Sequence, residues 1–161
     1  MADAAPAAPD AALVKLGEKL VPRAAAERAV QVSGSWFWWL AALSLINSLA
    51  AAGAVNYRMV LGLGFTQLLD RMFPLARAAH WALVLAIAGL FVVFGYCARR
   101  GSRGWYLAGM VVYALDALIF LPAQDWEALA FHVFVLYMLW RGFAALRALR
   151  RHDAGNAAAA G

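Results

Sequence analysis

The chain has 161 residues, of which 65% are hydrophobic and only 14% carry a charge. A soluble domain of this length could not bury so much apolar surface in one core, so the composition predicts a membrane protein and excludes an ordinary globular enzyme. The net charge of +5 would suit a nucleic-acid partner. However, the basic residues flank apolar segments and form no single patch with aromatic residues, so we expect no nucleic-acid binding.

The first region is an N-terminal arm, residues 1–34, which precedes the first long apolar segment. Its Ala/Pro-rich start predicts partial disorder, and the apolar residues Leu13, Leu16 and Leu20, interleaved with charged ones, predict a short amphipathic helix. The first long apolar run has the length of a membrane span, so we predict no cleaved signal peptide.

Four apolar segments follow, and they define a transmembrane domain over residues 35–147. At about 1.5 Å per helical residue, each is long enough to cross a hydrocarbon core of roughly 30 Å. We therefore predict an all-α fold, a four-helix transmembrane bundle, followed by a cytoplasmic tail over residues 148–161. The predicted spans are Ser35–Val55, Arg77–Cys97, Trp105–Leu121 and Trp126–Leu146.

The connection between the first two spans, residues 57–73, is apolar but too interrupted to cross a membrane. Gln67, Asp70 and Arg71 fall on one side at helical spacing, which predicts an additional amphipathic helix at the outer interface. A short re-entrant segment that ends at Pro74 is the alternative.

Small residues recur at every fourth position on two of the spans, as they do where helices approach closely in lipid. Ser44, Ser48 and Ala52 form such a stripe on the first span. Ala78, Ala82 and Ala86 form a second one on the next span, and the two stripes favour a compact bundle that associates further with copies of itself or with other membrane proteins.

The distribution of Lys and Arg predicts the orientation. With four spans, only Arg58, Arg71 and Arg77 fall on one side, and the positive-inside rule then places both termini in the cytoplasm. We therefore expect a multi-pass membrane protein in contact with the lipid bilayer. The basic residues on the predicted cytoplasmic side are Lys15, Lys19, Arg23, Arg28, Arg99, Arg100, Arg103, Arg141, Arg147, Arg150 and Arg151.

Few polar residues lie inside the spans, and these are the candidate functional residues. Asp116 near the end of the third span and His132 near the start of the fourth should meet at one depth in antiparallel neighbours. Tyr113 shares a helix face with Asp116, and Asn47 lies deeper on the first span. We predict an intramembrane polar cluster of Asp116, His132, Asn47 and Tyr113.

A second set of candidates lies at the predicted outer interface: Gln67, Asp70 and His80. His80 is either an interfacial residue beside Trp81 or a third ligand of a metal held with Asp116 and His132. The polar residues therefore have two interpretations. They fix the packing of the helices by hydrogen bonds, or they carry protons, bind a cation or ligate a metal, with haem ligation by two histidines as a further variant.

Five short strings combine apolar residues with the polar candidates: Phe37 to Ala41, Leu43 to Ser48, Gly62 to Gln67 with Asp70, Tyr113 to Asp116, and Phe131 with His132. These strings resemble those of a family of small four-span bacterial membrane proteins with no established activity. The resemblance covers roughly residues 36–143 and implies a bacterial inner-membrane protein, with no reaction attached. It would make Asn47, Gln67, Asp70, Asp116 and His132 the matching polar positions.

Three functions remain open. The first is a structural or accessory component of the membrane, with no cofactor and no enzymatic activity. The second is a small oligomeric transporter or channel that uses Asp116 and His132, and the third is a metal-binding membrane enzyme. No metalloprotease motif, nucleophile elbow or phosphate-binding loop points to a specific reaction.

Overall fold

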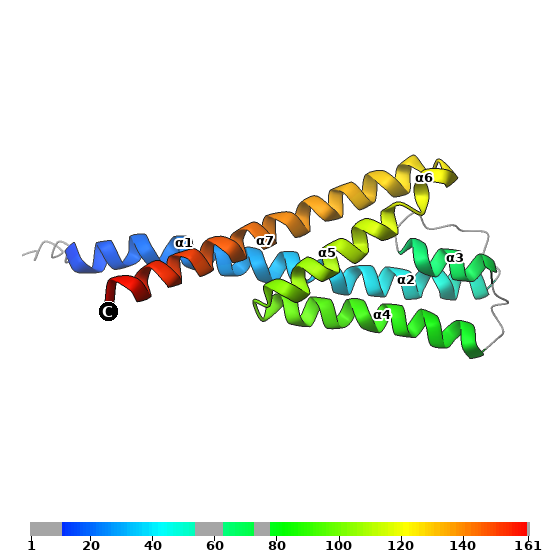
Figure 1. Ribbon diagram of the computed structural model, residues 1–161, viewed down its shortest axis with the longest axis horizontal. Helices are drawn as coiled ribbons and strands as arrows, with labels where there is room; N and C mark the ends of the chain where they lie inside the picture. Colours follow the sequence, from blue (N-terminus) through cyan, green and yellow to red (C-terminus); the bar gives the residue numbers. More distant parts are fainter. Residues whose placement is uncertain (1–10, 54–62, 73–77, 161) are drawn as a thin grey trace, which may run out of the picture.

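The computed structural model describes residues 11–53, 63–72 and 78–160, and their secondary structure is helix and turn with no strand. Figure 1 shows a bundle at one end and a pair of helices that extends from it at the other. The helices are α1 (Ala11–Gly34), α2 (Trp36–Ala52), α3 (Gly64–Met72), α4 (Ala78–Arg99), α5 (Arg103–Ala117), α6 (Phe120–Ala123) and α7 (Trp126–Ala160).

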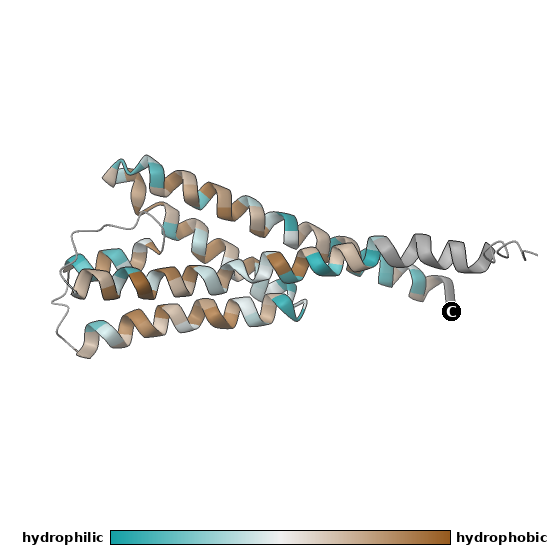
Figure 2. Cartoon of the chain, turned by 180° about the vertical axis from the view of Figure 1, so that it is seen from behind, coloured by the Kyte–Doolittle hydropathy of each residue, from teal (hydrophilic) through white to brown (hydrophobic). Residues whose placement is uncertain are grey.

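Four helical stretches in the described residues are long and apolar enough to cross a membrane, which confirms the predicted all-α fold with four spans. Apolar residues dominate the helices of the bundle, and polar ones gather toward its two ends (Figure 2). The stretches differ in detail from the predicted ones, because α1 and α2 together form the first and α5 and α6 the third. They run over Pro22–Ala52, Ala78–Arg99, Arg103–Ala123 and Trp126–Ala158.

The first and the last of the described helices are both long. α1 and α7 lie side by side beyond the bundle (Figure 1), where the Arg23 guanidinium donates to the Asp153 carboxylate at 2.6 Å and to the Glu27 carboxylate at 3.0 Å. The predicted arm and the predicted tail therefore pack against each other as helices. The amphipathic face predicted near Leu13–Leu20 lies in the part of α1 whose side chains fall outside the described residues.

An aromatic core fixes how α2, α4 and α5 pack. The Phe37 side chain of α2 is fully buried, and its ring lies 6.2 Å from that of Phe91 and 5.8 Å from that of Tyr106. Gly109 of α5 faces Phe37, and a Cβ there would lie 2.7 Å from the ring. A glycine is therefore needed for the close approach of α5 to α2.

The two small-residue stripes have different surroundings. Ser44 and Ser48 of α2 are buried, and both contact the segment that includes α3. Ala78, Ala82 and Ala86 are exposed on α4, so this second stripe packs against nothing within the described chain.

The direction of α3 decides the geometry of the candidate site. The backbone N–H of Leu63, just before α3, donates to Ser44 Oγ at 2.8 Å, and Ser48 Oγ donates to Asp70 Oδ2 near the end of α3 at 3.1 Å. Thus α3 runs in the same direction as α2 and alongside its second half (Figure 1). Because Ser44 precedes the α2 end, Ala52, by eight residues, α3 begins about 12 Å inside that end of the bundle.

Candidate functional site

Asp116 lies at the last turn of α5, and its side chain is fully buried. Its Oδ1 accepts a hydrogen bond from the backbone N–H of Phe65 at 2.7 Å, and its Oδ2 accepts one from the N–H of Gly64 at 2.8 Å. The first backbone N–H groups of a helix have no partner within that helix, and its N-terminus carries partial positive charge. Asp116 therefore satisfies and stabilises the start of α3, although it belongs to a different helix.

His132 of α7 completes this arrangement. Its Nε2 lies 3.0 Å from Asp116 Oδ2, and its Nδ1 lies 2.8 Å from the carbonyl oxygen of Ala128. Since a carbonyl can only accept, Nδ1 carries a hydrogen, and Nε2 either donates to a carboxylate or accepts from a carboxylic acid. In both cases the Asp116–His132 pair holds one proton between its two side chains.

Aromatic rings enclose the pair. The Tyr113 ring stacks on the His132 ring, with centroids 4.5 Å apart and planes 14° from parallel, and the Phe120 ring lies 4.9 Å from it. The Tyr113 hydroxyl is buried and makes no hydrogen bond within the described chain. The fourth predicted member of the cluster, Asn47, is also buried on α2, one turn after Ser44.

A second Asp–His pair lies toward the other end of α3. His80 of α4 is 1% exposed, and its Nε2 is 3.1 Å from Asp70 Oδ1. The two atoms lack the alignment of a hydrogen bond, and neither Asp70 Oδ1 nor either nitrogen of His80 has a hydrogen-bond partner in the described structure. Burial raises the pKa of the Asp70 carboxyl, and the Ser48 hydroxyl and His80 partly oppose this rise.

The predicted candidates are thus brought together in two groups, one at each end of α3. Asp116, His132 and Tyr113 gather at the start of the helix, and Asp70 and His80 gather toward its end. His80 pairs with Asp70, so the structure does not bring it to Asp116 and His132 as a third ligand. Over the described ranges, no three His, Cys, Asp or Glu side chains gather as a metal site.

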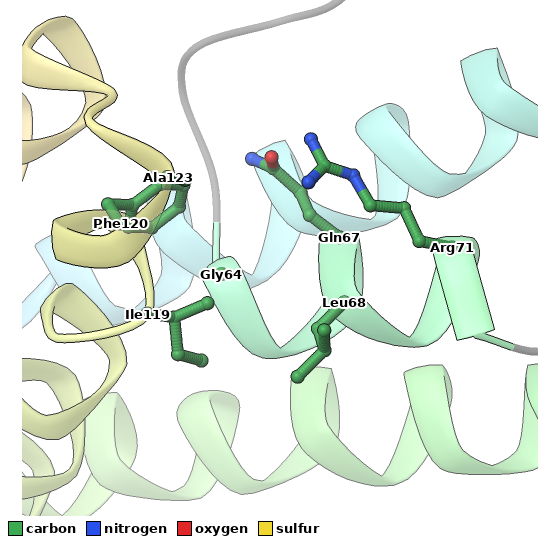
Figure 3. A pocket seen from close by; sticks show the side chains of 7 residues that line it. All are labelled: Gly64, Gln67, Leu68, Arg71, Ile119, Phe120 and Ala123. Carbon is green, nitrogen blue, oxygen red and sulfur yellow. The ribbon is translucent and has the colours of Figure 1, made fainter.

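Gln67, the remaining candidate, belongs to neither pair. It lines a small pocket between α3 and the α5–α6 turn together with Arg71, and Figure 3 shows both side chains on the same side of α3. The pocket is completed by Gly64, Leu68, Ile119, Phe120 and Ala123.

Sequence analysis did not identify Ser44 and Ser48 as polar partners of the connection between the first two spans. Both serines appeared only as small residues that allow close packing, yet their hydroxyl groups accept from Leu63 and donate to Asp70. The available signal was a hydroxyl repeated at i and i+4 within an apolar helix, because such groups hydrogen-bond across helices in membranes.

Comparison with protein-family models, with curated proteins and with solved structures found no match to this chain. Its class follows from the fold: four apolar helices of spanning length, with buried polar groups paired across helices, are compatible with a multi-pass integral membrane protein.

Proposed function

We propose that the chain is a structural or accessory component of a bacterial cytoplasmic membrane, and a member of the small four-span family that it resembles. Four helices of spanning length support the membrane location. The excess of Lys and Arg at the chain ends and in the Arg99–Arg103 turn supports cytoplasmic termini. In this orientation α3 lies in the outer half of the membrane.

In this proposal α3 is a re-entrant half-helix and does not lie flat on the membrane surface. Its path beside the second half of α2, starting about 12 Å inside the end of that helix, supports this assignment. Irregular backbone at membrane depth is tolerated only where protein groups satisfy its hydrogen bonds. Here Ser44 satisfies the N–H of Leu63, and Asp116 satisfies those of Gly64 and Phe65.

The observation that supports a structural role is that the Asp116 carboxyl group is fully engaged in hydrogen bonds within the chain. Its carboxylate has three partners, two backbone N–H groups and the His132 ring, and no exposed surface. A side chain that transports a substrate must give up its protein partners to bind that substrate. A side chain that fixes a helix must instead keep its hydrogen bonds to the protein. The Asp116–His132 pair therefore holds the start of α3 in the bundle.

A flux assay tests this role. The protein is reconstituted into vesicles that contain a pH-sensitive dye, and proton entry is followed after a pH gradient and a membrane potential are imposed. We expect the flux to equal that of vesicles without protein. Flux that depends on wild-type protein and is abolished by Asp116→Asn would instead assign a transport function to the pair.

An accessory role also requires another protein as a partner, and cross-linking in cells tests this requirement. A photoreactive amino acid at the exposed position Leu85 of α4 should yield an adduct whose mass is no multiple of the 17.4 kDa chain. The same residue at the buried position Val84 is the matched control and should yield none. Only self-adducts at Leu85 would favour a homo-oligomer without an accessory role.

The second candidate function is proton or cation transport through the Asp70–His80 pair. The specific observation in its favour is that His80 Nδ1 is buried without a hydrogen-bond partner within the described chain, while Nε2 lies 3.1 Å from Asp70 Oδ1. Nδ1 therefore remains available to a proton or to water, unlike the oxygens of Asp116. This function predicts that the wild-type protein gives flux in the vesicle assay. Asp70→Asn and His80→Gln, each with Asp116 unchanged, should abolish that flux.

A further inference from the structure

Two hydrogen-bond donors lie one turn apart on the same side of α3 and have no acceptor in the described chain. The Gln67 Nε2 is buried without a hydrogen-bond partner. Arg71 is exposed and makes no ion pair or hydrogen bond to the described residues. A guanidinium has five N–H donors and no acceptor, and the unpartnered atom of Gln67 is also a donor. A ligand that binds both groups must therefore accept hydrogen bonds.

The recess beside these donors is small and mostly apolar. It has a volume of about 30 Å³, room for one or two groups the size of water, and its far wall is formed by Ile119, Phe120 and Ala123. Figure 3 shows the Gln67 and Arg71 side chains extending on one side of α3, across from Phe120 and Ala123. The recess therefore admits an oxygen or two of a ligand whose remainder lies outside.

The carboxylates of the site leave the charge of Arg71 unneutralised. Asp70, its neighbour in sequence, is turned to Ser48 of α2 and His80 of α4. Asp116 is occupied by the start of α3 and by His132. Asp125 and Glu127 line a separate recess beyond Ala123, and Asp125 Oδ1 accepts from the N–H of Ala128. An anionic acceptor from outside the chain would therefore find two donors in the recess between α3 and α6, and it would accept from the buried amide N–H of Gln67.

Apolar side chains line the recess and reach the surface. Leu68 is 41% exposed, Ile119 is partly exposed and Ala123 is exposed. An inorganic anion gains nothing from such a surface, but an anion attached to hydrocarbon does, because its chains cover these apolar side chains.

We propose that the recess between α3 and α6 binds the phosphate of an anionic phospholipid. Gln67 and Arg71 donate to the phosphate oxygens, and the acyl chains lie against Leu68 and Ile119. The inference rests on the proposed placement of the chain in a membrane. The bound phosphate would also sit against α3 and thereby add to the contacts that hold it.

The test is native mass spectrometry of the purified full-length chain in detergent, titrated separately with phosphatidylglycerol, phosphatidylcholine and inorganic phosphate. We expect one phosphatidylglycerol per chain to bind tightly. Arg71→Gln and Gln67→Met should each weaken this binding about tenfold, the effect of losing one charge-assisted hydrogen bond. The matched control is Arg103→Gln, an exposed arginine at the opposite end of the bundle, which should change the affinity less than twofold.

Every other outcome overturns the assignment. Equal affinity for inorganic phosphate would make the recess a free-anion site. Equal affinity for phosphatidylcholine would show that the net charge of the lipid is not recognised. Unchanged binding in both variants would place the lipid elsewhere, and no binding at all would leave the recess to water.

Two controls separate these outcomes from other failures. Far-ultraviolet circular dichroism must show that each variant keeps the helix content of the wild type. Alkaline carbonate extraction of cell membranes tests the membrane placement independently. A chain released by carbonate would refute the proposed function, whereas a retained chain that binds no phosphatidylglycerol would refute only the lipid site.

Discussion

The Asp116 carboxylate at the end of α5 lies 3.0 Å from the ring of His132 on α7, and it also accepts the first two backbone N–H groups of α3. One side chain therefore joins α5, where it lies, to α3 and α7. The consequence is that a single buried carboxylate holds the first residues of α3, and its contribution to stability can be measured.

Replacement of Asp116 by Leu should lower the free energy of unfolding by about 3 kcal/mol or more. The variant leaves the N–H groups of Gly64 and Phe65 and one nitrogen of His132 buried without partners, and each such group costs about 1–3 kcal/mol. Asp116→Asn keeps one acceptor oxygen and should cost less. Unfolding in mixed detergent and dodecyl sulfate, followed by circular dichroism, measures both values.

Asp153→Asn is the matched control, because this carboxylate pairs with Arg23 on an exposed part of α1 and α7. It should leave the unfolding midpoint almost unchanged, since exposed ion pairs contribute little. If Asp116→Leu lowered the unfolding midpoint as little as Asp153→Asn, the Asp116–His132 pair would have no structural role.

The accessibility of cysteines placed on α3 should report whether Asp116 holds this helix in the bundle. In a Cys97→Ala background, Thr66→Cys should react slowly with a water-soluble maleimide because Thr66 is fully buried, whereas Met72→Cys should react quickly because Met72 is 66% exposed. Addition of Asp116→Leu should speed the reaction at position 66 by about tenfold or more, because local opening then requires less free energy. Equal rates at position 66 with and without Asp116 would show that the carboxylate does not hold α3.

Two glycines of the bundle should respond oppositely to alanine. Gly109→Ala places a Cβ 2.7 Å from the Phe37 ring and should destabilise the fold by about 1–3 kcal/mol. Gly89→Ala on α4 meets nothing within 4 Å and should be neutral or stabilise the helix by up to about 1 kcal/mol. The same unfolding assay compares them, and a mild effect at position 109 would mean that α5 and α2 pack less closely than described.

The stability should depend on pH through Asp70. Burial raises the pKa of Asp70 in the folded protein above its value in the unfolded chain. At pH values between these two pKa values, the folded state therefore binds more protons than the unfolded state. Stability should therefore fall as the pH rises from the ordinary carboxyl range through the raised folded-state pKa. Asp70→Asn should flatten this part of the stability curve, and a curve that keeps its slope in the variant would assign the effect to another group.

The sequence by itself determined the class of structure. Four apolar runs of spanning length, separated by charged turns, allow few arrangements other than a helical membrane bundle, because only helices satisfy their own backbone hydrogen bonds in lipid. The polar face formed by Gln67, Asp70 and Arg71 likewise predicted a short helix between the first two spans, and α3 covers it. The sequence also predicted that Asp116 meets His132, because the two residues lie at similar distances from the connection between their spans, and their side chains are 3.0 Å apart.

Only the tertiary structure decided what these polar groups do. Hydropathy gives the length of a helix but neither its rotation about its axis nor the direction of a short segment beside it. The path of α3 along α2 brings the N–H groups of Gly64 and Phe65 to Asp116, and it carries Asp70 to His80 and Ser48. These contacts join segments up to 52 residues apart, so they depend on how the helices pack and leave no periodic trace in the sequence.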